Sequence, residues 1–423
     1  MTPLAQRHDQ RFAPDNRGYS HRDRAKVHGY RYLLNGQALE HTFEYRFHQD
    51  QISYLAQLQV VGNPSSVHGS GQKARRAVED ARDRLAVTLG CHRSEVLFTS
   101  GGTESNNLAI KGLFLQRFGE DPNRKIVITA GTEHHAGIDP VEWLESAEGA
   151  EAVWAPVDTM GVIDLDWLRD FLAKNAERVA LISFMWVNNE TGLITPIAAI
   201  TEMAGKYGIP VHSDAVAAFG HVPIIFKESG LATMAVSGHK LGAPVGVGAL
   251  IAARAAKLAV TSHGGGQERG IRSGTLSSPL AYAFAEAAAL AEAERDALHD
   301  RLESFKQQIV KAVLEIAPNA NFTRGDKPGF AGIIHFTFPG CSGDSLLFLL
   351  DSAGVSVSTG SACRAGVAQA SHVIMAMGRT EDEARGSLRI SLGYTTTQSD
   401  VEGFITAFSG VYQRAVKAGL PSQ

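Results

Sequence analysis

The sequence predicts an α/β fold in two parts, a large domain built on a mostly parallel, doubly wound sheet and a smaller α+β C-terminal domain. Short apolar runs alternate with helical stretches from about residue 61 onward, as in strands joined by helices. A long Ala/Glu/Leu-rich helix then ends this alternation. The 423 residues are also too many for one compact core, so more than one domain is expected.

The elements of the large domain, residues 61–295, are predicted first. Apolar residues recur at helical spacing from Ala74 to Leu89, and Gly90 follows as a stop. Apolar runs predict strands at Glu95–Thr99, Ile126–Ile128, Val179–Phe184, Pro210–His212, Met234–Val236 and Ala249–Ala252. The long helix, from about Pro279 to Ile316, is expected to enter the small domain, residues 296–423. There, Ile333–Phe338, Ser345–Leu350, Val355–Ser358 and Leu388–Ser391 indicate an α+β unit.

Composition narrows the class of protein. Hydrophobic residues make up 44% and charged residues 20%, which is typical of a soluble globular protein. A net charge of −4 argues against non-specific nucleic-acid binding, and no apolar run is long enough to cross a bilayer. Three scattered cysteines are too few for a disulfide framework or a zinc site, so we expect no metal and a reducing, cytoplasmic location.

Polar segments follow several of the predicted strands directly. In open α/β sheets, ligands bind at the carboxyl ends of the strands, so these segments are expected to meet at one edge. Ser100-Gly-Gly-Thr-Glu-Ser105 lies between a strand and a helix predicted to begin near Thr103. Free N–H groups at a helix start, with glycines and a hydroxyl, form an anion cup, although a plain strand–helix turn has the same pattern.

A lysine ends the segment Ser237-Gly-His-Lys240, after the strand Met234–Val236. A lysine in such a place is usually a solvated surface residue. Here the apolar and glycine neighbours are expected to desolvate its ammonium in part, which lowers the pKa and suits Schiff-base formation. Ser237 and His239 are placed to hydrogen-bond the same phosphate as the anion cup.

Further polar residues end strands or lie within them. A buried carboxylate at Asp214 needs a partner, either a pyridinium nitrogen or the N–H groups of a helix that it caps. His134 is either a ring that lies over a cofactor and moves protons or, as is commoner, a structural histidine. Asn188 or Asn189 follows a strand at a level where an amide can donate to a cofactor's ring oxygen. Arg389, in an apolar strand, needs an anion such as a substrate carboxylate.

Cys363 lies in Ser358-Thr-Gly-Ser-Ala-Cys-Arg-Ala-Gly366, a small, polar and flexible segment. The adjacent Arg364 lowers the thiol pKa and favours the thiolate, so Cys363 is a candidate nucleophile. Cys91 and Cys341 have no comparable setting and are expected to be structural.

These segments together resemble the cysteine desulfurases of the NifS/IscS type, in the class V aminotransferase group of fold-type I enzymes that use pyridoxal 5'-phosphate. The resemblance covers residues 61 to about 415. Its matching segments are Gly62–His68, Thr99–Ser105, Thr132–His134, Val187–Glu190, His212–Ala215, Ser237–Lys240, His263–Arg269, Arg272–Thr275, Gly360–Cys363 and Leu388–Gly393.

The resemblance implies a role for each candidate. Lys240 holds pyridoxal phosphate as a Schiff base and moves protons, Asp214 pairs with the pyridine nitrogen, and His134 stacks on the ring. The phosphate is bound by Gly102, Thr103, Ser237 and His239, with Thr275 reaching it from the other subunit of a homodimer. Asn189 contacts cofactor and substrate, and Arg389 holds the substrate carboxylate.

The implied reaction is removal of sulfur from L-cysteine, which leaves L-alanine and a persulfide on Cys363. The sulfur acceptor is then an iron–sulfur scaffold protein, a tRNA-thiolating enzyme or both. Rival readings are selenocysteine lyase or another class V activity, and a degenerate, inactive homologue that acts as a scaffold.

Two departures from the family pattern stand out. The family usually has glutamine three residues after the aspartate that pairs with the pyridine nitrogen, where this chain has Ala217. The family also opens with Tyr-Leu-Asp-Asn-Ala-Ala-Thr, and residues 1–60 contain no such segment. Our hypothesis is that residues 1–60 are out-of-frame or otherwise foreign sequence, poorly packed. Reading the coding DNA in its other two frames tests it, and the hypothesis fails if neither encodes the missing segment.

Overall fold

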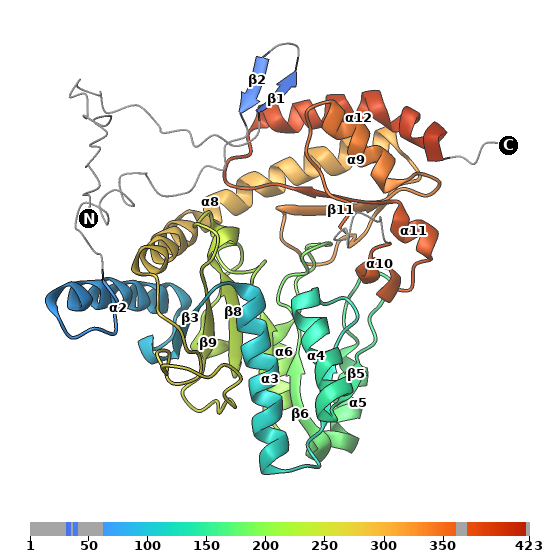
Figure 1. Cartoon of the computed structure of the whole chain (residues 1–423). Helices are drawn as coiled ribbons and strands as arrows, with labels where there is room; N and C mark the ends of the chain where they lie inside the picture. Colours follow the sequence, from blue (N-terminus) through green and yellow to red (C-terminus); the bar gives the residue numbers. More distant parts are fainter. Residues whose placement is uncertain (1–30, 35–36, 41–61, 361–369, 420–423) are drawn as a thin grey trace, which may run out of the picture.

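The computed structural model describes residues 31–34, 37–40, 62–360 and 370–419 (Figure 1). Within residues 1–60, the described parts are β1 (Arg31–Leu34) and β2 (Gln37–Glu40), which pair as antiparallel strands. The hypothesis of a foreign segment therefore falls almost wholly outside the described residues and stays a prediction. None of the helices in the described ranges is long and apolar enough to span a membrane.

A seven-stranded sheet forms the centre of the large domain, with the strand order β3-β9-β8-β7-β6-β4-β5. The strands are β3 (Val96–Thr99), β4 (Ile126–Thr129), β5 (Glu151–Trp154), β6 (Val179–Ser183), β7 (Val211–Asp214), β8 (Thr233–Ser237) and β9 (Gly248–Ala252). β9 is antiparallel to both of its neighbours, and the remaining pairs are parallel, so the predicted mostly parallel sheet is confirmed. β5 was not predicted, because this edge strand is short and only partly buried.

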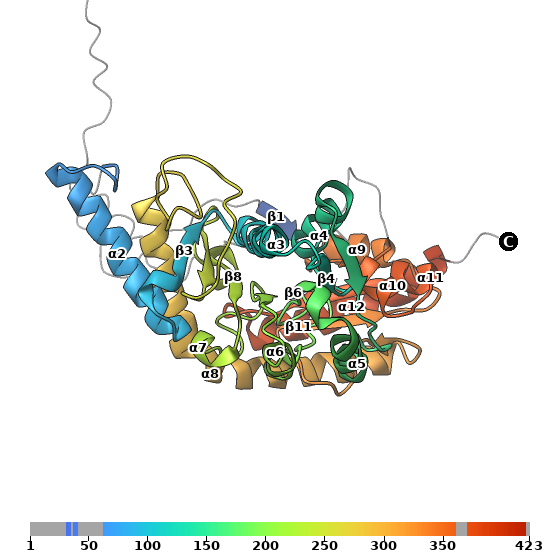
Figure 2. The same cartoon turned by 90° about the horizontal axis from the view of Figure 1, so that it is seen from below.

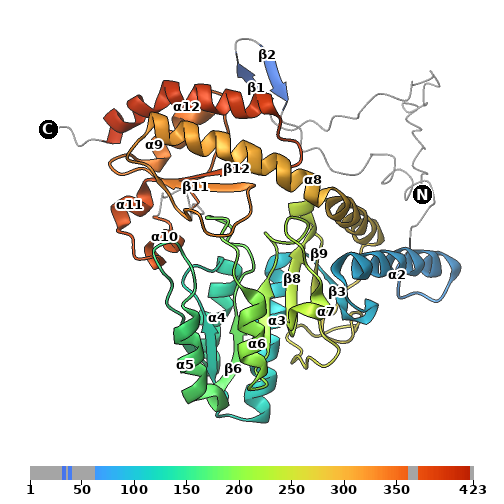
Figure 3. The same cartoon turned by 180° about the vertical axis from the view of Figure 1, so that it is seen from behind.

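Helices cover both faces of this sheet. α3 (Gly102–Glu120) and α4 (His135–Glu148) lie on the face seen in Figure 1, and α5 (Leu165–Asn175) and α6 (Ile197–Gly205) lie on the face seen in Figure 3. The view from below shows the sheet between these two layers (Figure 2). Short helices lie in the connections: η1 (Arg93–Glu95) and η2 (Ala176–Arg178) precede β3 and β6, and α7 (Phe226–Ser229) and η3 (Gly238–Leu241) join β7 to β8 and β8 to β9. This arrangement is the predicted doubly wound fold.

Two of the predicted helices pack against each other beside the sheet, and the second of them leads into the small domain. α2 (Gly69–Leu89) ends at Gly90, whose left-handed backbone conformation has a φ of 61° and so favours glycine. α8 (Ser278–Ile316) begins at the N-cap Ser277 and runs for 39 residues. It packs against α2 near one end and against α12 in the small domain. The predicted domain boundary at residue 295 lies within this helix and stays a prediction.

The small domain holds a three-stranded antiparallel sheet of β10 (Asn321–Phe322), β11 (Ile333–Thr337) and β12 (Ser387–Ser391). Its helices are α9 (Gly343–Ser352), α10 (His372–Ala376), α11 (Glu381–Arg385) and α12 (Gln398–Gly419). The rings of Phe336, Phe338, Phe408 and Tyr412 contact one another between β11 and α12. They bury the face of the small sheet that lies toward α12.

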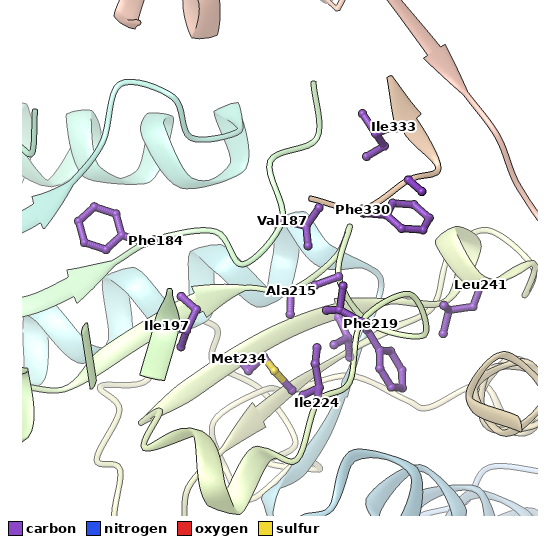
Figure 4. Close-up of a cluster of buried hydrophobic side chains, with 14 of the residues drawn as sticks. Phe184, Val187, Ile197, Ala215, Phe219, Ile224, Met234, Leu241, Phe330 and Ile333 are labelled. Carbon is purple, nitrogen blue, oxygen red and sulfur yellow. The ribbon is translucent and has the colours of Figure 1, made fainter. Parts of the chain in front are cut away.

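The apolar core continues from the large sheet into the small domain. Phe330 and Ile333, at the start of β11, lie beside Val187 in the loop that follows β6 (Figure 4). The backbone seals the same contact, since Phe330 N–H donates to the carbonyl oxygen of Gly192 at 2.8 Å. A side chain at Gly192 would collide with Ile333, because an added Cβ would stand 2.8 Å from its carbonyl oxygen. The loop after β6 is thereby fixed between the two domains.

A buried ion pair ties the loop after β9 to the edge of the sheet. Arg82 on α2 donates to both carboxylate oxygens of Glu268, at 2.7 and 2.8 Å. The Arg82 guanidinium also donates to the Val96 carbonyl oxygen, and Glu268 accepts from Phe98 N–H. Both partners are buried, and Arg82 also pairs with the more exposed Glu79, so protein groups largely replace water around the two buried charges.

We expect Arg82→Ala to lower the free energy of unfolding by about 3–5 kcal/mol, because it leaves the Glu268 carboxylate buried without a cation. The matched control is Lys257→Ala, which breaks an exposed pair with Glu120 and should leave the free energy of unfolding nearly unchanged, because water screens that pair. Urea denaturation of both variants measures the difference. Equal decreases in the free energy of unfolding for the two variants would show that the buried Arg82 pair contributes no more to stability than the exposed pair.

Candidate active site

The carboxyl ends of the parallel strands carry the polar residues that the sequence singled out. Gly102 and Thr103 follow β3, His134 follows β4, Asn189 follows β6, Asp214 ends β7, and Ser237 and Lys240 lie at the end of β8. Arg389 approaches this edge from β12 of the small domain, where its Nη1 donates to the Asn189 carbonyl oxygen at 2.9 Å. The candidate site therefore lies between the sheet edge and the small domain.

An anion cup lies at the start of α3. The N-cap Gly101 has no side chain to cap the helix, so the N–H groups of the first turn keep their free hydrogens. A Cβ added at Gly102 would stand 2.4 Å from Cγ2 of Val216, so only glycine leaves the backbone this close to the strand ends. Ser237 Oγ lies next to this turn and is 2.9 Å from His239 Nδ1. The structure thus brings together most of the residues predicted to bind phosphate.

Asp214 is a carboxylate without a cation at the end of β7. Its Oδ1 accepts from Val216 N–H at 2.9 Å, and its Oδ2 accepts from the Asn106 amide at 2.5 Å. Burial raises the pKa of the Asp214 carboxyl, and these two hydrogen bonds, with His134 and Lys240 nearby, oppose that rise. Among the residues that the structure describes, no lysine, arginine or histidine forms an ion pair with it.

Lys240 lies in η3, directly after β8. Neighbouring protein desolvates its amine and lowers the lysine pKa, and the positive charge of Arg389 lowers it further. Asp214 acts in the opposite sense, which places the carboxylate within electrostatic reach of the amine. The amine remains accessible, so it combines exposure to a ligand with a lowered pKa, as a Schiff-base lysine requires.

His134 has a structural bond and an accessible ring. As the N-cap of α4, it accepts from Ala136 N–H through Nδ1 at 2.9 Å. Burial and nearby positive groups lower the His134 pKa, while Asp214 opposes that change. The ring and Thr103 line one wall of a cavity of about 510 Å³ between α3 and α4. The structural and functional readings of this histidine are therefore compatible.

The two asparagines after β6, Asn188 and Asn189, differ in their hydrogen bonds. The Asn188 side chain serves the loop, since it donates to the Thr132 carbonyl oxygen and accepts from the N–H groups of Glu190 and Thr191. The Asn189 Oδ1 is buried without a hydrogen-bond partner, and so is the Nε of Arg389. Such unpaired atoms are costly unless a ligand pairs with them, which makes Asn189 and Arg389 the candidates for binding.

Comparison with known proteins agrees with this geometry. Residues 51–404 match the family model for aminotransferase class-V. The chain belongs to that family. It is 45% identical over 384 residues to an IscS-like cysteine desulfurase of Mycobacterium tuberculosis, covering 90% of this chain and 98% of the relative. It is 38% identical to the cysteine desulfurase IscS of Dictyoglomus turgidum, covering 80% and 84%.

Solved structures give the same result. A NifS-like protein superposes with a TM-score of 0.77 at 29% identity, covering 86% of this chain and 95% of the other. A NifS-like protein from Rickettsia africae superposes with a TM-score of 0.75 at 31% identity, covering 86% and 96%. The predicted resemblance to class V cysteine desulfurases and the predicted fold are thus confirmed.

The class V family uses pyridoxal phosphate, and the residues present fit that group. The glycine cup at Gly102 suits its phosphate, and the unpaired carboxylate of Asp214 suits a ring N–H. The accessible amine of Lys240 lies in electrostatic contact with that carboxylate. A departure remains at Ala217, a partly buried residue that offers no side-chain donor near Asp214.

Two predicted site residues, Thr275 and Cys363, have no contact with this site that the described residues show. Thr275 is exposed, and within the described ranges no hydrogen bond links it to the site, so its role in a neighbouring subunit stays a prediction. Cys363 lies outside the described residues. Burial raises the thiol pKa of Cys91 to about 12 and that of Cys341 to about 11, so both are poor nucleophiles at neutral pH.

Glu190 is a site residue that sequence reasoning missed, although it lies in a matching segment. Only 2% of its surface is exposed. Its Oε2 accepts from Ser371 Oγ at 2.6 Å, and a Cβ added at Gly360 would stand 2.7 Å from the same oxygen. Glu190 therefore contacts the described residues on both sides of the segment that contains Cys363. Burial raises the Glu190 carboxyl pKa, and Ser371, His372 and Arg389 oppose that rise.

The lowered pKa of Lys240 predicts that its amine reacts with an acylating reagent at a lower pH than an ordinary lysine, for which the pKa is about 10.4. Competitive labelling across a pH series, read by mass spectrometry in protein stripped of cofactor, gives the midpoint. Arg389→Met should move this midpoint upward, because it removes a cation that disfavours the protonated amine. The control Arg385→Met, on the exposed surface of α11, should not move it.

A Lys240 labelling profile that coincides with that of the exposed Lys311 in the same sample would contradict this account.

Proposed function

We propose that this chain is a cysteine desulfurase that holds pyridoxal phosphate on Lys240 and transfers sulfur from L-cysteine to Cys363. The observation that carries the proposal is that Lys240, an exposed lysine whose amine is partly desolvated, lies within electrostatic reach of Asp214, a carboxylate with no ion-pair partner among the described residues. The proposal includes release of L-alanine and passage of the sulfur to an acceptor for iron–sulfur cluster assembly, tRNA thiolation or both.

The residues at the strand ends would each hold one part of the cofactor. The first turn of α3, at Gly102 and Thr103, would donate to the phosphate together with Ser237 and His239. The Asp214 carboxylate would accept from the ring N–H, and His134 would lie over the ring. Bound there, pyridoxal phosphate supplies an electron sink for negative charge that develops at the substrate α-carbon.

Arg389 and Asn189 would hold the substrate. The Arg389 guanidinium already donates to the Asn189 carbonyl oxygen, and its unpaired Nε can donate to a carboxylate. Because the Lys240 pKa is lowered, a larger fraction of its amine is unprotonated near neutral pH than for an ordinary lysine, so the amine is available to take a proton from the substrate. Lys240 is therefore placed to move the proton between the substrate's carbon atoms and solvent.

Cys363 would carry out the sulfur transfer. Its thiolate forms a sulfur–sulfur bond with the substrate thiol as the substrate carbon–sulfur bond breaks. The electron pair of the broken bond remains on the substrate β-carbon, which then takes up a proton to become the methyl group of alanine. The persulfide on Cys363 is thereby formed without an external oxidant.

The proposal also includes a homodimer, in which Thr275 of each subunit would contact the phosphate of its neighbour. Thr275 is exposed on the loop that Glu268 and Arg82 anchor, which supports this assignment. The rival readings, selenocysteine lyase or an inactive scaffold, remain alternatives that the next experiment separates.

Cys363→Ser is expected to abolish sulfide release from L-cysteine in the presence of a thiol reductant, while cofactor binding stays intact. Sulfide and alanine are measured side by side in the wild type and the variant. Cys91→Ser, a matched cysteine whose thiol pKa is raised, should retain both products. Undiminished sulfide from Cys363→Ser would sink the assignment of the nucleophile.

If the wild type binds pyridoxal phosphate but releases no sulfide from L-cysteine, the result favours the hypothesis of an inactive scaffold. Release of selenide from selenocysteine alone would favour the lyase.

Ala217→Gln is expected to tighten cofactor retention and to shift the pH titration of the bound cofactor's absorption, because it restores a donor near the ring oxygen. A hydrogen bond to a charged group contributes about 1.5–3 kcal/mol, which corresponds to roughly 10- to 150-fold in the dissociation constant. Ala217→Leu, similar in size but without a donor, is the control. Titration curves that coincide for the wild type and Ala217→Gln would remove the idea.

A further inference from the structure

A chain of buried polar side chains runs behind Asp214, away from the candidate site. Thr233 on β8 is 2.9 Å from His212 Nδ1, and His212 Nε2 on β7 is 3.0 Å from Asn106 Oδ1 on α3. Asn106 Nδ2 then donates to Asp214 Oδ2 at 2.5 Å. Thr233, His212 and Asn106 are each 0% exposed. Three elements of the large domain therefore converge on one carboxylate.

Each hydrogen bond in this row of side chains has one direction, from donor to acceptor. The carboxylate of Asp214 accepts, so the Asn106 nitrogen faces it and the Asn106 oxygen faces His212. That oxygen requires a hydrogen on His212 Nε2. Burial lowers the His212 pKa to about 3, so the ring is neutral and its Nδ1 carries no hydrogen. Nδ1 therefore accepts from the Thr233 hydroxyl, and every donor in the chain points toward Asp214.

The geometry has a consequence for the carboxylate. Val216 N–H holds one oxygen and the Asn106 amide holds the other, so the plane of the Asp214 carboxylate is fixed. Both donors are neutral. They stabilise the charged form of Asp214 without neutralising it, which leaves its full negative charge for a ligand at the open end.

We propose that Asn106 and His212 are positioning residues that keep the Asp214 carboxylate ionised and oriented for the protonated ring nitrogen of the cofactor. The proposal rests on the proposed function, because it assumes pyridoxal phosphate in this site. Neither side chain touches the cofactor, and both act through Asp214.

The small domain offers a matched control for the burial of a neutral histidine. His335 on β11 is also 0% exposed, and its Nδ1 is 2.7 Å from Thr323 Oγ1. Burial lowers its pKa to about 3, as it does for His212. His335 therefore has the same chemistry and the same type of partner, but it has no bond to Asn106 or Asp214.

The test compares two ligands in protein stripped of cofactor. One ligand is pyridoxal phosphate, and the other is its analogue in which carbon replaces the ring nitrogen. We expect Asn106→Leu and His212→Leu to raise the dissociation constant of pyridoxal phosphate by about 10-fold or more. The same variants should change the dissociation constant of the analogue by less than about 3-fold, because the analogue has no ring N–H for Asp214.

Two further variants separate positioning from folding. His212→Gln keeps a donor and an acceptor side by side and should restore most of the affinity for pyridoxal phosphate. His335→Leu should lower stability and leave the affinity for both ligands unchanged. If His212→Leu fails to fold, Asn106→Ser, which shortens the donor, is measured in its place.

Equal losses for the two ligands would overturn the proposal, because a structural defect weakens both alike. Wild-type affinity for pyridoxal phosphate in both Asn106→Leu and His212→Leu would also overturn it. A wild type that binds no pyridoxal phosphate is a different result, since it contradicts the proposed function itself.

Discussion

The Asp214 carboxylate is the constraint on which the rest of the site depends. It stands at the end of β7, in the middle of the seven-stranded sheet, and receives two neutral hydrogen bonds and, from the residues that the structure describes, no ion pair. A buried charge in this state is costly unless a ligand pairs with it. The fold tolerates the charge because donors from α3 and from its own turn hold it, and the resulting field reaches Lys240.

Lys240 experiences opposing influences from the two domains. Asp214 on the large sheet favours its charged form, whereas Arg389 on the small sheet disfavours it. Burial lowers the pKa of the Arg389 guanidinium, and the nearby Glu190 carboxylate opposes that change. Burial is the largest cause of the lowered Lys240 pKa, and the position of the small domain adds to it through Arg389. The apolar contact of Phe330 and Ile333 with Val187 fixes that position.

The fold could be predicted largely from the sequence because its strands are continuous apolar runs. β6 and β8 were found for that reason, whereas the edge strand β5 is only partly buried and lacks the pattern. Asp214 and Lys240 were found because each lies at or just after the end of a predicted strand. Side chains whose partners lie far along the chain were not found. His212 and Asn106 are 106 residues apart, and no local pattern announces their hydrogen bond.

The choice between Asn188 and Asn189 shows what only three-dimensional packing can decide. The two are adjacent and chemically identical, so spacing favours neither. Packing turns Asn188 into the loop, where its amide makes bonds to Thr132, Glu190 and Thr191. Because these bonds fix the loop, the neighbouring Asn189 keeps an unpaired oxygen beside Arg389. The hydrogen-bonded Asn188 thus holds Asn189 in place. Glu190 links the same loop to the described residues on either side of the Cys363 segment. The proposed substrate site and the described residues on either side of the Cys363 segment are thus joined by one hydrogen-bonded turn between the two domains.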